Sequence, residues 1–208
     1  MPDTLRRLKT DLSACRHCEE VGILPRARPV FQLPENPVVG LFGQAPGNLA
    51  HQKGMPFMDP SGVRLRAWMG LNEEEFYEGG RLAIVPMAFC FPGYDGKSKT
   101  GKGGDLPPPK VCAEKWRARA MDLILPRLKV ILLVGGYAQR WHLGDKMKKT
   151  LTETVAQWPR RFKEAADGSP LYLPLPHPSW RNTAWLKRNP WFEEEVVPRL
   201  QNSIRAVW

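Results

Sequence analysis

Four short apolar segments, separated by stretches of helical character, are the sequence feature that most restricts the fold. They are residues 37–42, 81–87, 129–136 and 171–176. Each has the length of a β-strand, and the first and third are rich in Val or Ile. Strands joined by helical connections form a parallel sheet with helices on both faces. We therefore predict an α/β fold, a three-layer α/β/α arrangement around a four-stranded, mostly parallel sheet, in a single domain over residues 1–208.

Apolar spacing and polar capping residues predict the helices that connect these strands. The predicted helices cover residues 3–14 and 150–157, and others begin after Ser61, after Asn72, at Cys112 and near Pro190. Residues 159–169 are polar, and we expect an exposed connection there. Pro174 and Pro176 lie in the last apolar segment and lack a backbone N–H, so we expect that strand to be unpaired on one side.

Each apolar segment runs into an unusual loop. The loops begin with residues 43–47 (Gly-Gln-Ala-Pro-Gly), 90–93, 135–137 and 177–182. The carboxyl ends of parallel strands meet at one edge of a sheet, where open α/β folds bind their ligands. We therefore expect these four loops to form one site.

The charge balance favours a polyanionic partner. Lys and Arg number 31 against 21 Asp and Glu, a formal net charge of +10. Such a chain is suited to nucleic acid, although a basic protein without that partner is the open alternative. The candidates for phosphate contacts are Lys97, Lys99, Lys102, Lys187 and Arg188, which could equally form a solvated surface.

No apolar run is long enough to span a membrane, and the first residues lack the apolar segment of a signal peptide, so we expect a cytoplasmic protein. Four cysteines in such a compartment are metal ligands or free thiols more often than disulfides. Cys15 and Cys18 form a Cys-x-x-Cys pair, and with Cys90 and Cys112 they could hold zinc or an iron–sulfur cluster. His17 is a further candidate ligand.

These motifs, taken in order, resemble those of the uracil-DNA glycosylases. Residues 43–47 resemble motif A, most closely that of the iron–sulfur (family 4) branch, and residues 54–57 (Gly-Met-Pro-Phe) resemble the segment that follows it. His177-Pro178-Ser179 resembles motif B, and its extension to Asn182 is similar to that of the single-strand-selective enzymes. The four cysteines match the order of the family-4 cluster ligands.

The resemblance implies a DNA repair enzyme that hydrolyses the N-glycosidic bond of uracil in DNA and leaves an abasic site. The base must first leave the helical stack. The implied catalytic residues are Gln44 and His177; those that bind the base are Gly43, Ala45, Gly47 and Phe57; those that bind DNA are Ser179, Trp180, Arg181 and Asn182. The implied cofactor is a [4Fe–4S] cluster on Cys15, Cys18, Cys90 and Cys112, with zinc as the alternative. We expect a monomer.

Several of these roles have structural alternatives. His177 could be a structural histidine, and Phe57 could pack in the core. Asp59 could position water or cap a helix. Trp180 or Arg181 could fill the gap left by an extruded base; alternatively, Trp180 packs and Arg181 holds a phosphate.

The chain also departs from the family pattern. Residues 84–87 read Ile-Val-Pro-Met, where the family carries an Asn that reads the uracil edge. Ala45 occupies the place of the Asp that activates water in family 1, and Gln44 replaces a Glu. The motif loops contain no evident Lys nucleophile, so we expect a monofunctional enzyme. The missing Asn leaves two alternatives open: a non-catalytic nucleic-acid-binding protein of this fold, and a glycosylase that prefers hypoxanthine or xanthine.

Overall fold

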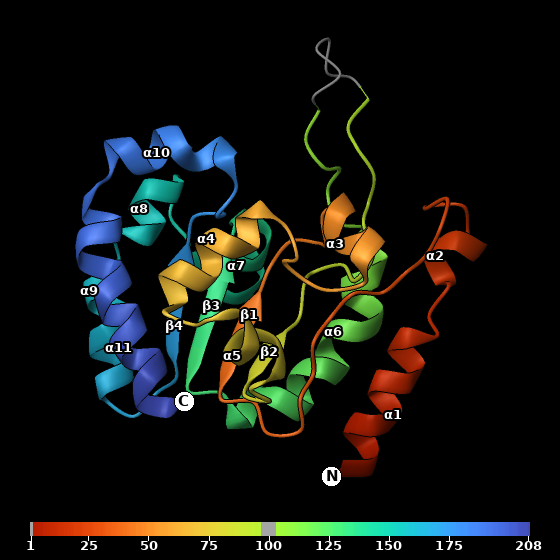
Figure 1. The fold of residues 1–208 in the computed structure, drawn as a ribbon, viewed down its shortest axis with the longest axis horizontal. Helices are drawn as coiled ribbons and strands as arrows, with labels where there is room; N and C mark the ends of the chain where they lie inside the picture. The colour runs from red at the N-terminus through yellow and green to blue at the C-terminus, as the bar shows by residue number, and fades with distance from the viewer. Residues whose placement is uncertain (1, 97–102) are drawn as a thin grey trace.

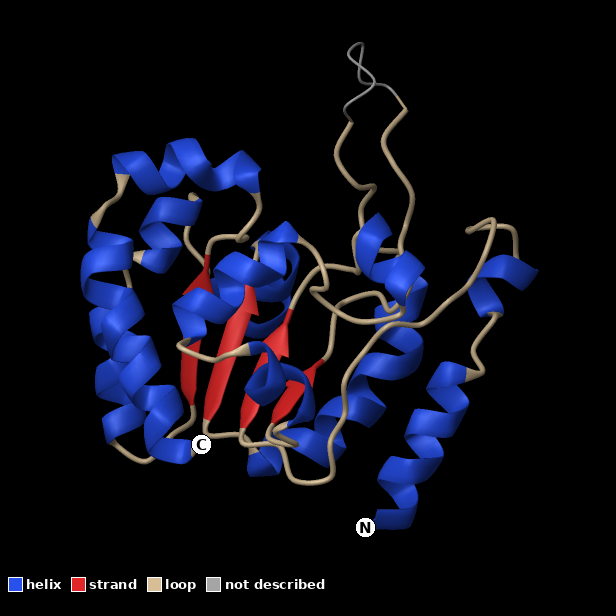
Figure 2. Cartoon of the chain, in the orientation of Figure 1, coloured by secondary structure: helices blue, strands red, loops and turns tan. Residues whose placement is uncertain are grey.

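A computed structural model of the protein describes residues 2–96 and 103–208 (Figures 1 and 2). The strands of its central sheet are β1 (Val39–Phe42), β2 (Leu82–Ile84), β3 (Val130–Val134) and β4 (Leu171–Leu175). Their order is β2-β1-β3-β4, and each neighbouring pair is parallel. Helices cover both faces of the sheet, so the predicted three-layer α/β/α fold is confirmed. All strand pairs of this sheet are parallel, which sharpens the prediction of a mostly parallel sheet.

The helices lie in two layers. The described α-helices are α1 (Pro2–Ser13), α2 (His17–Glu20), α3 (Asn48–Lys53), α4 (Pro60–Met69), α5 (Glu73–Glu78), α6 (Lys110–Ile124), α7 (Gly136–Leu143), α8 (Leu151–Val155), α9 (Trp158–Ala166), α10 (Thr183–Arg188) and α11 (Val197–Val207). A π-helical turn at Phe192–Val196 leads into α11, and short 3₁₀ turns lie at Leu125–Arg127, Gly144–Lys146 and Trp180–Asn182. Among the described residues, no helix is both long and apolar enough to cross a membrane.

The apolar strands are buried on both faces. Val39 and Leu41 of β1 pack into the core shared with α4, α10 and α11, whereas Phe42 packs into the core shared with α1, α6 and α7. The same alternation recurs along β3. Gly40 lets β1 approach Leu128 closely, because a Cβ atom there would lie 2.6 Å from Cδ1 of Leu128 and that side chain would have to shift. Burial on both sides explains why these strands read as continuous apolar runs.

Two expectations about the carboxyl-terminal half had different outcomes. β4 is an edge strand, as its prolines predicted. The expectation of an exposed connection over residues 159–169 missed α9. Trp158, Phe162 and Ala165 of this helix are spaced at i, i+4 and i+7 and pack against the core, so the apolar stripe outweighs the polar composition.

β2 is shorter than the predicted segment 81–87. Beyond Ile84, the chain leaves the ladder and follows the loop after β1. The N–H groups of Met87 and Ala88 donate to the carbonyls of Gly43 and Gln44 over 2.9 and 3.0 Å. These two hydrogen bonds hold the loop of residues 43–47 against the segment that follows β2.

Candidate active site

A cavity of about 670 Å³ opens at the carboxyl edge of the sheet. Figure 1 shows the loops that follow the four strands gathering at this edge. The site residues that the sequence predicted for base and DNA binding all line the cavity: Gly43, Gln44, Ala45, Gly47, Phe57, His177, Ser179, Trp180, Arg181 and Asn182. The four cysteines line a different cavity. The structure therefore brings motif A, motif B and the segment between them together.

The loop after β1 offers backbone donors to this cavity. Its carbonyls at Gly43 and Gln44 are occupied by the segment after β2. Within the described parts of the chain, the backbone N–H groups of Gln44 and Ala45 have no hydrogen-bond partner. The Gln44 side chain donates through Nε2 to the carbonyl of Leu106 over 3.5 Å. The backbone of this loop is thus available to an anionic or carbonyl oxygen.

His177 is held as a neutral hydrogen-bond donor. Its Nδ1 accepts from the backbone N–H of Ser179 over 3.2 Å, so the ring proton lies on Nε2. Its carbonyl accepts from Nδ2 of Asn182 over 2.8 Å, which fixes the loop after β4. Burial lowers the pKa of His177, and the negative charge of Asp59 only partly opposes this shift. At neutral pH the imidazole therefore presents an uncharged N–H.

Phe57 is placed by an unusual backbone. Its φ of 56° is the only positive value at a non-glycine residue within the described ranges, and this conformation costs roughly 1–2 kcal/mol. Gly62 makes it possible, because a Cβ atom at residue 62 would lie 1.7 Å from the Phe57 carbonyl oxygen. The tip of the ring lies 3.7 Å from where a Cβ atom of Gly43 would be. The ring thus forms a wall beside the donor loop.

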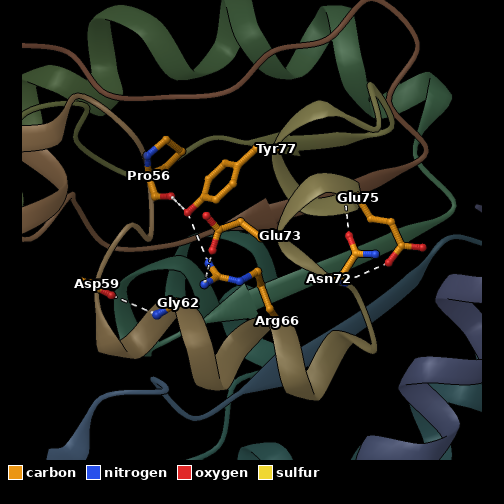
Figure 3. A network of polar contacts seen from close by, with 8 residues as sticks. All are labelled: Pro56, Asp59, Gly62, Arg66, Asn72, Glu73, Glu75 and Tyr77. Atoms are coloured by element: carbon orange, nitrogen blue, oxygen red, sulfur yellow. Dashed lines mark hydrogen bonds and ion pairs between the residues drawn. The ribbon is translucent and has the colours of Figure 1, made fainter.

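A polar network fixes the segment that carries Phe57 (Figure 3). The hydroxyl of Tyr77 donates to the Pro56 carbonyl over 3.0 Å, and Nη1 of Arg66 lies 3.4 Å from that hydroxyl. Arg66 also pairs with Glu73 at 3.1 Å. Sequence reasoning missed this bracing, because the partners belong to different helices, α4 and α5, and no local pattern joins them.

Asp59 has the geometry of a helix cap and also faces the site. Its Oδ1 accepts from the N–H of Gly62 over 2.9 Å at the start of α4 (Figure 3). Its Oδ2 lies 3.7 Å from where a Cβ atom of Gly47 would be, and Asp59 lines the cavity. The capping role is therefore present, and a second oxygen remains toward the cavity.

Trp180 and Arg181 stand at the mouth of the cavity. Trp180 is 72% exposed, and the guanidinium of Arg181 lies 5.4 Å from its ring centroid. Arg181 also donates through Nη2 to the Gly103 carbonyl over 3.2 Å. Lys187 and Arg188 are exposed in the last turn of α10. The predicted phosphate contacts Lys97, Lys99 and Lys102 lie outside the described residues.

The remaining cavity wall includes residues that the sequence did not single out. Ile84 of β2 and Pro86, which follows the strand, both line the cavity and belong to the segment 84–87 that lacks an Asn. Gln139 of α7 donates through Nε2 to the carbonyls of Leu133 and Leu175, and so joins the ends of β3 and β4. Asp105 also lines the cavity. It directly follows a run of Gly and Lys, which gives no sequence signal for a pocket residue.

All four cysteines line a small, almost wholly apolar cavity of about 20 Å³ between α1, α2 and α6. None of the four forms a disulfide. Burial raises the pKa of Cys90 to about 11 and that of Cys112 to about 12. Cys112 Sγ accepts from the N–H of Phe89 over 3.4 Å. In the described parts of the chain, no three His, Cys, Asp or Glu side chains gather as ligands of one metal ion.

The fold and the site together define an α/β protein with a cavity at the carboxyl edge of a parallel sheet. Backbone donors, an aromatic wall and a neutral imidazole face one cavity at the sheet edge. A family model described as the uracil DNA glycosylase superfamily matches residues 30–201. The chain belongs to the uracil DNA glycosylase superfamily.

A solved structure is also similar to this chain. It is the solution NMR structure of a "putative Uracil DNA glycosylase" from Methanosarcina acetivorans, with 17% sequence identity and a TM-score of 0.44. The match covers 82% of this chain and 93% of the other.

Proposed function

We propose that this protein is a monofunctional DNA glycosylase that hydrolyses the N-glycosidic bond of uracil, or of a related deaminated base, in DNA and leaves an abasic site. Membership of the superfamily supports DNA glycosylase activity. One observation carries the proposal further. The free N–H groups of Gln44 and Ala45, the ring of Phe57 and the neutral imidazole of His177 line a single cavity.

These groups meet the chemical needs of the reaction. An extruded base stacks on Phe57, which is worth roughly 1–3 kcal/mol. As the bond from C1′ to the base nitrogen breaks, negative charge develops on the base. The N–H groups of the 43–47 loop and Nε2–H of His177 can donate to a base oxygen that carries this charge. Preorganised donors of this kind contribute roughly 3 kcal/mol each to the transition state.

The composition of the cavity supports a simple hydrolysis. The described residues that line it include no lysine that could form a Schiff base. We propose hydrolysis without strand cleavage. The proposed partner is DNA that contains the target base, and the proposed active species is a monomer.

The preferred base is the finer part of the proposal. Ile84 and Pro86 line the wall where an amide would read the uracil edge, so recognition there falls to the backbone and to shape. Because these two side chains offer no amide that would select uracil, hypoxanthine and xanthine are alternative substrates. The composition of this wall is also the observation that favours the second candidate, a nucleic-acid-binding protein of the same fold without catalysis.

A panel of oligonucleotides distinguishes the proposed glycosylase, its alternative substrates and the non-catalytic binding protein. Single- and double-stranded DNA with uracil, hypoxanthine or xanthine at one position is incubated with the protein, and free base and abasic sites are measured. We expect release of uracil, and a loss of about 100-fold or more in His177→Ala. Binding to every oligonucleotide without release of any base would contradict the enzymatic proposal and favour the binding protein.

We also propose that the four cysteines hold a [4Fe–4S] cluster that ties α1, α2 and α6 to the sheet. Support comes from the donor set: four sulfurs around one apolar cavity, with one accepting a backbone N–H. Iron and sulfide in the purified protein, lost in Cys112→Ser, are expected; zinc alone would contradict the cluster.

A further inference from the structure

Asp105 stands at the base of a hairpin that closes one side of the cavity. The arms of this hairpin meet at a bridge between Tyr94 and Asp105, and the N–H of Leu106 donates to the Gly93 carbonyl over 2.8 Å. The hairpin is also attached to both motif loops. Gln44 donates to the Leu106 carbonyl, and Arg181 donates to the carbonyl of Gly103. These contacts fix the position of Asp105 beside the site.

The Asp105 carboxylate faces Asp59 across Gly47. Its Oδ2 lies 3.9 Å from where a Cβ atom of Gly47 would be, and Oδ2 of Asp59 lies 3.7 Å from the same point. The two carboxylate oxygens are therefore no farther apart than the sum of these two distances. Both lie close to the space that a side chain at residue 47 would fill. The charges of Arg181 and Asp59 both act on the Asp105 carboxylate. It also lines the cavity.

The proposed hydrolysis needs such a group. A water molecule must be held near C1′ of the deoxyribose and must lose a proton as it attacks. The loop of residues 43–47 contains no carboxylate, since Ala45 and Gln44 are both uncharged. Asp59 uses one oxygen to cap α4. Asp105 caps none of the described helices.

We propose that Asp105 is a second catalytic carboxylate, which together with Asp59 holds the attacking water and accepts its proton. This inference rests on the proposed glycosylase function. In the step, the water oxygen forms a bond to C1′ while the bond from C1′ to the base nitrogen breaks. The electron pair of that bond leaves with the base, which His177 and the 43–47 loop stabilise as an anion. The water proton moves to Asp105, and solvent later protonates the base.

The electrostatics around Asp105 agree with a proton acceptor. The surrounding protein desolvates the carboxyl and raises the pKa of Asp105, Arg181 opposes that rise, and Asp59 adds to it. A raised pKa makes a carboxylate a stronger base. The rate should then climb as the pH rises through the pKa of this group, and the climb should disappear when the carboxyl is replaced by an amide.

The test is the single-turnover rate of base release by Asp105→Asn across a range of pH, on the base that the wild type releases. Asp95→Asn is the matched control, because it removes the same charge from the same hairpin and is not among the described residues that line the cavity. We expect Asp105→Asn to be slower by about 100-fold or more, with a flattened acidic limb and DNA affinity close to that of Asp95→Asn. Formate should partly restore the rate of Asp105→Ala.

The outcomes separate the two levels of the proposal. An active wild type with Asp105→Asn within about two-fold of Asp95→Asn overturns the role of Asp105 and leaves the glycosylase function intact. Equal losses in both variants, with equally weakened DNA binding and no formate rescue, also overturn it, because they indicate a hairpin or charge effect. A wild type that releases no base contradicts the proposed function and this inference with it.

Discussion

At the scale of single residues, the position of the Phe57 side chain requires a strained backbone conformation. Its positive φ persists because Gly62, the Pro56 carbonyl and Tyr77 hold the backbone on both sides. Strained non-glycine residues of this kind concentrate at functional sites. The strain makes sense if the ring is needed beside the loop of residues 43–47.

Phe57→Leu should keep the apolar volume and lose the flat stacking surface. We expect base release to slow by about 10-fold or more, since base–aromatic stacking is worth roughly 1–3 kcal/mol. Phe162→Leu on α9 is the control, because that ring packs against the core and does not line the cavity among the described residues. Equal rates in the two variants would show that Phe57 is ordinary packing.

Much of the site could be predicted from residue types alone. Gly-Gln-Ala-Pro-Gly and His-Pro-Ser are compact local signals, and the structure places both at one cavity. Asp105, Gln139 and Tyr77 carried no such signal. Their positions depend on a hairpin, a strand connection and a helix pair, and contacts between segments far apart in the chain leave no local pattern.

At the scale of elements, the first turn of α4 packs closely against the backbone of Phe57, and Gly62 forms this contact. Gly62→Ala would push a Cβ atom into the carbonyl oxygen of Phe57. We expect a loss of roughly 2 kcal/mol or more in the free energy of unfolding, together with slower base release, because α4 and Phe57 must separate. Denaturant unfolding measures the first effect.

Gly96→Ala is the control for this substitution, since its Cβ atom would meet no atom of the described residues within 4 Å. An unfolding free energy for Gly62→Ala equal to that of Gly96→Ala would contradict the close fit between Gly62 and the Phe57 carbonyl.

The packing of α6 on α7 predicts a pH dependence of stability. Burial and the charge of Arg117 lower the pKa of His142 to about 3, and its ring stacks on Phe42. The unfolded chain protonates this residue below about pH 6.5. Between about pH 6.5 and 3, the unfolded state therefore binds the extra proton, and stability falls as the pH falls, by up to about 1.4 kcal/mol per pH unit.

His142→Gln should be less stable at neutral pH and should lose this part of the slope. Denaturant unfolding of both proteins at several pH values measures it. Identical slopes in the wild type and in His142→Gln would show that the imidazole is not held neutral by the fold.

Elements were more predictable where periodicity was strong. The four strands followed from apolar runs of strand length, while α9 was missed because polar residues fill most of its turns. Its apolar stripe at Trp158, Phe162 and Ala165 was the available signal. Three apolar positions in a nine-residue helix give a weak periodic signal, and Pro159 and several charged residues weaken it further.

At the scale of the whole molecule, the net charge of +10 predicts a strong salt dependence of DNA binding. The double substitution Lys187→Gln, Arg188→Gln removes two exposed charges from α10 near the motif B loop. We expect the slope of log affinity against log salt to decrease by about 1–2. Lys9→Gln, on α1, is the control and should leave the slope nearly unchanged; an unchanged slope in the double variant would refute these phosphate contacts.

The central claim is that the loop after β1, Phe57 and His177 form one pocket for a base taken out of DNA. NMR of the labelled protein with abasic-analogue DNA, titrated with free uracil, tests it without relying on turnover. The account predicts that uracil shifts the backbone amides of Gln44 and Ala45 and the imidazole of His177, saturably and together. Uracil-dependent shifts confined to other surfaces, or none at saturating base, would contradict it.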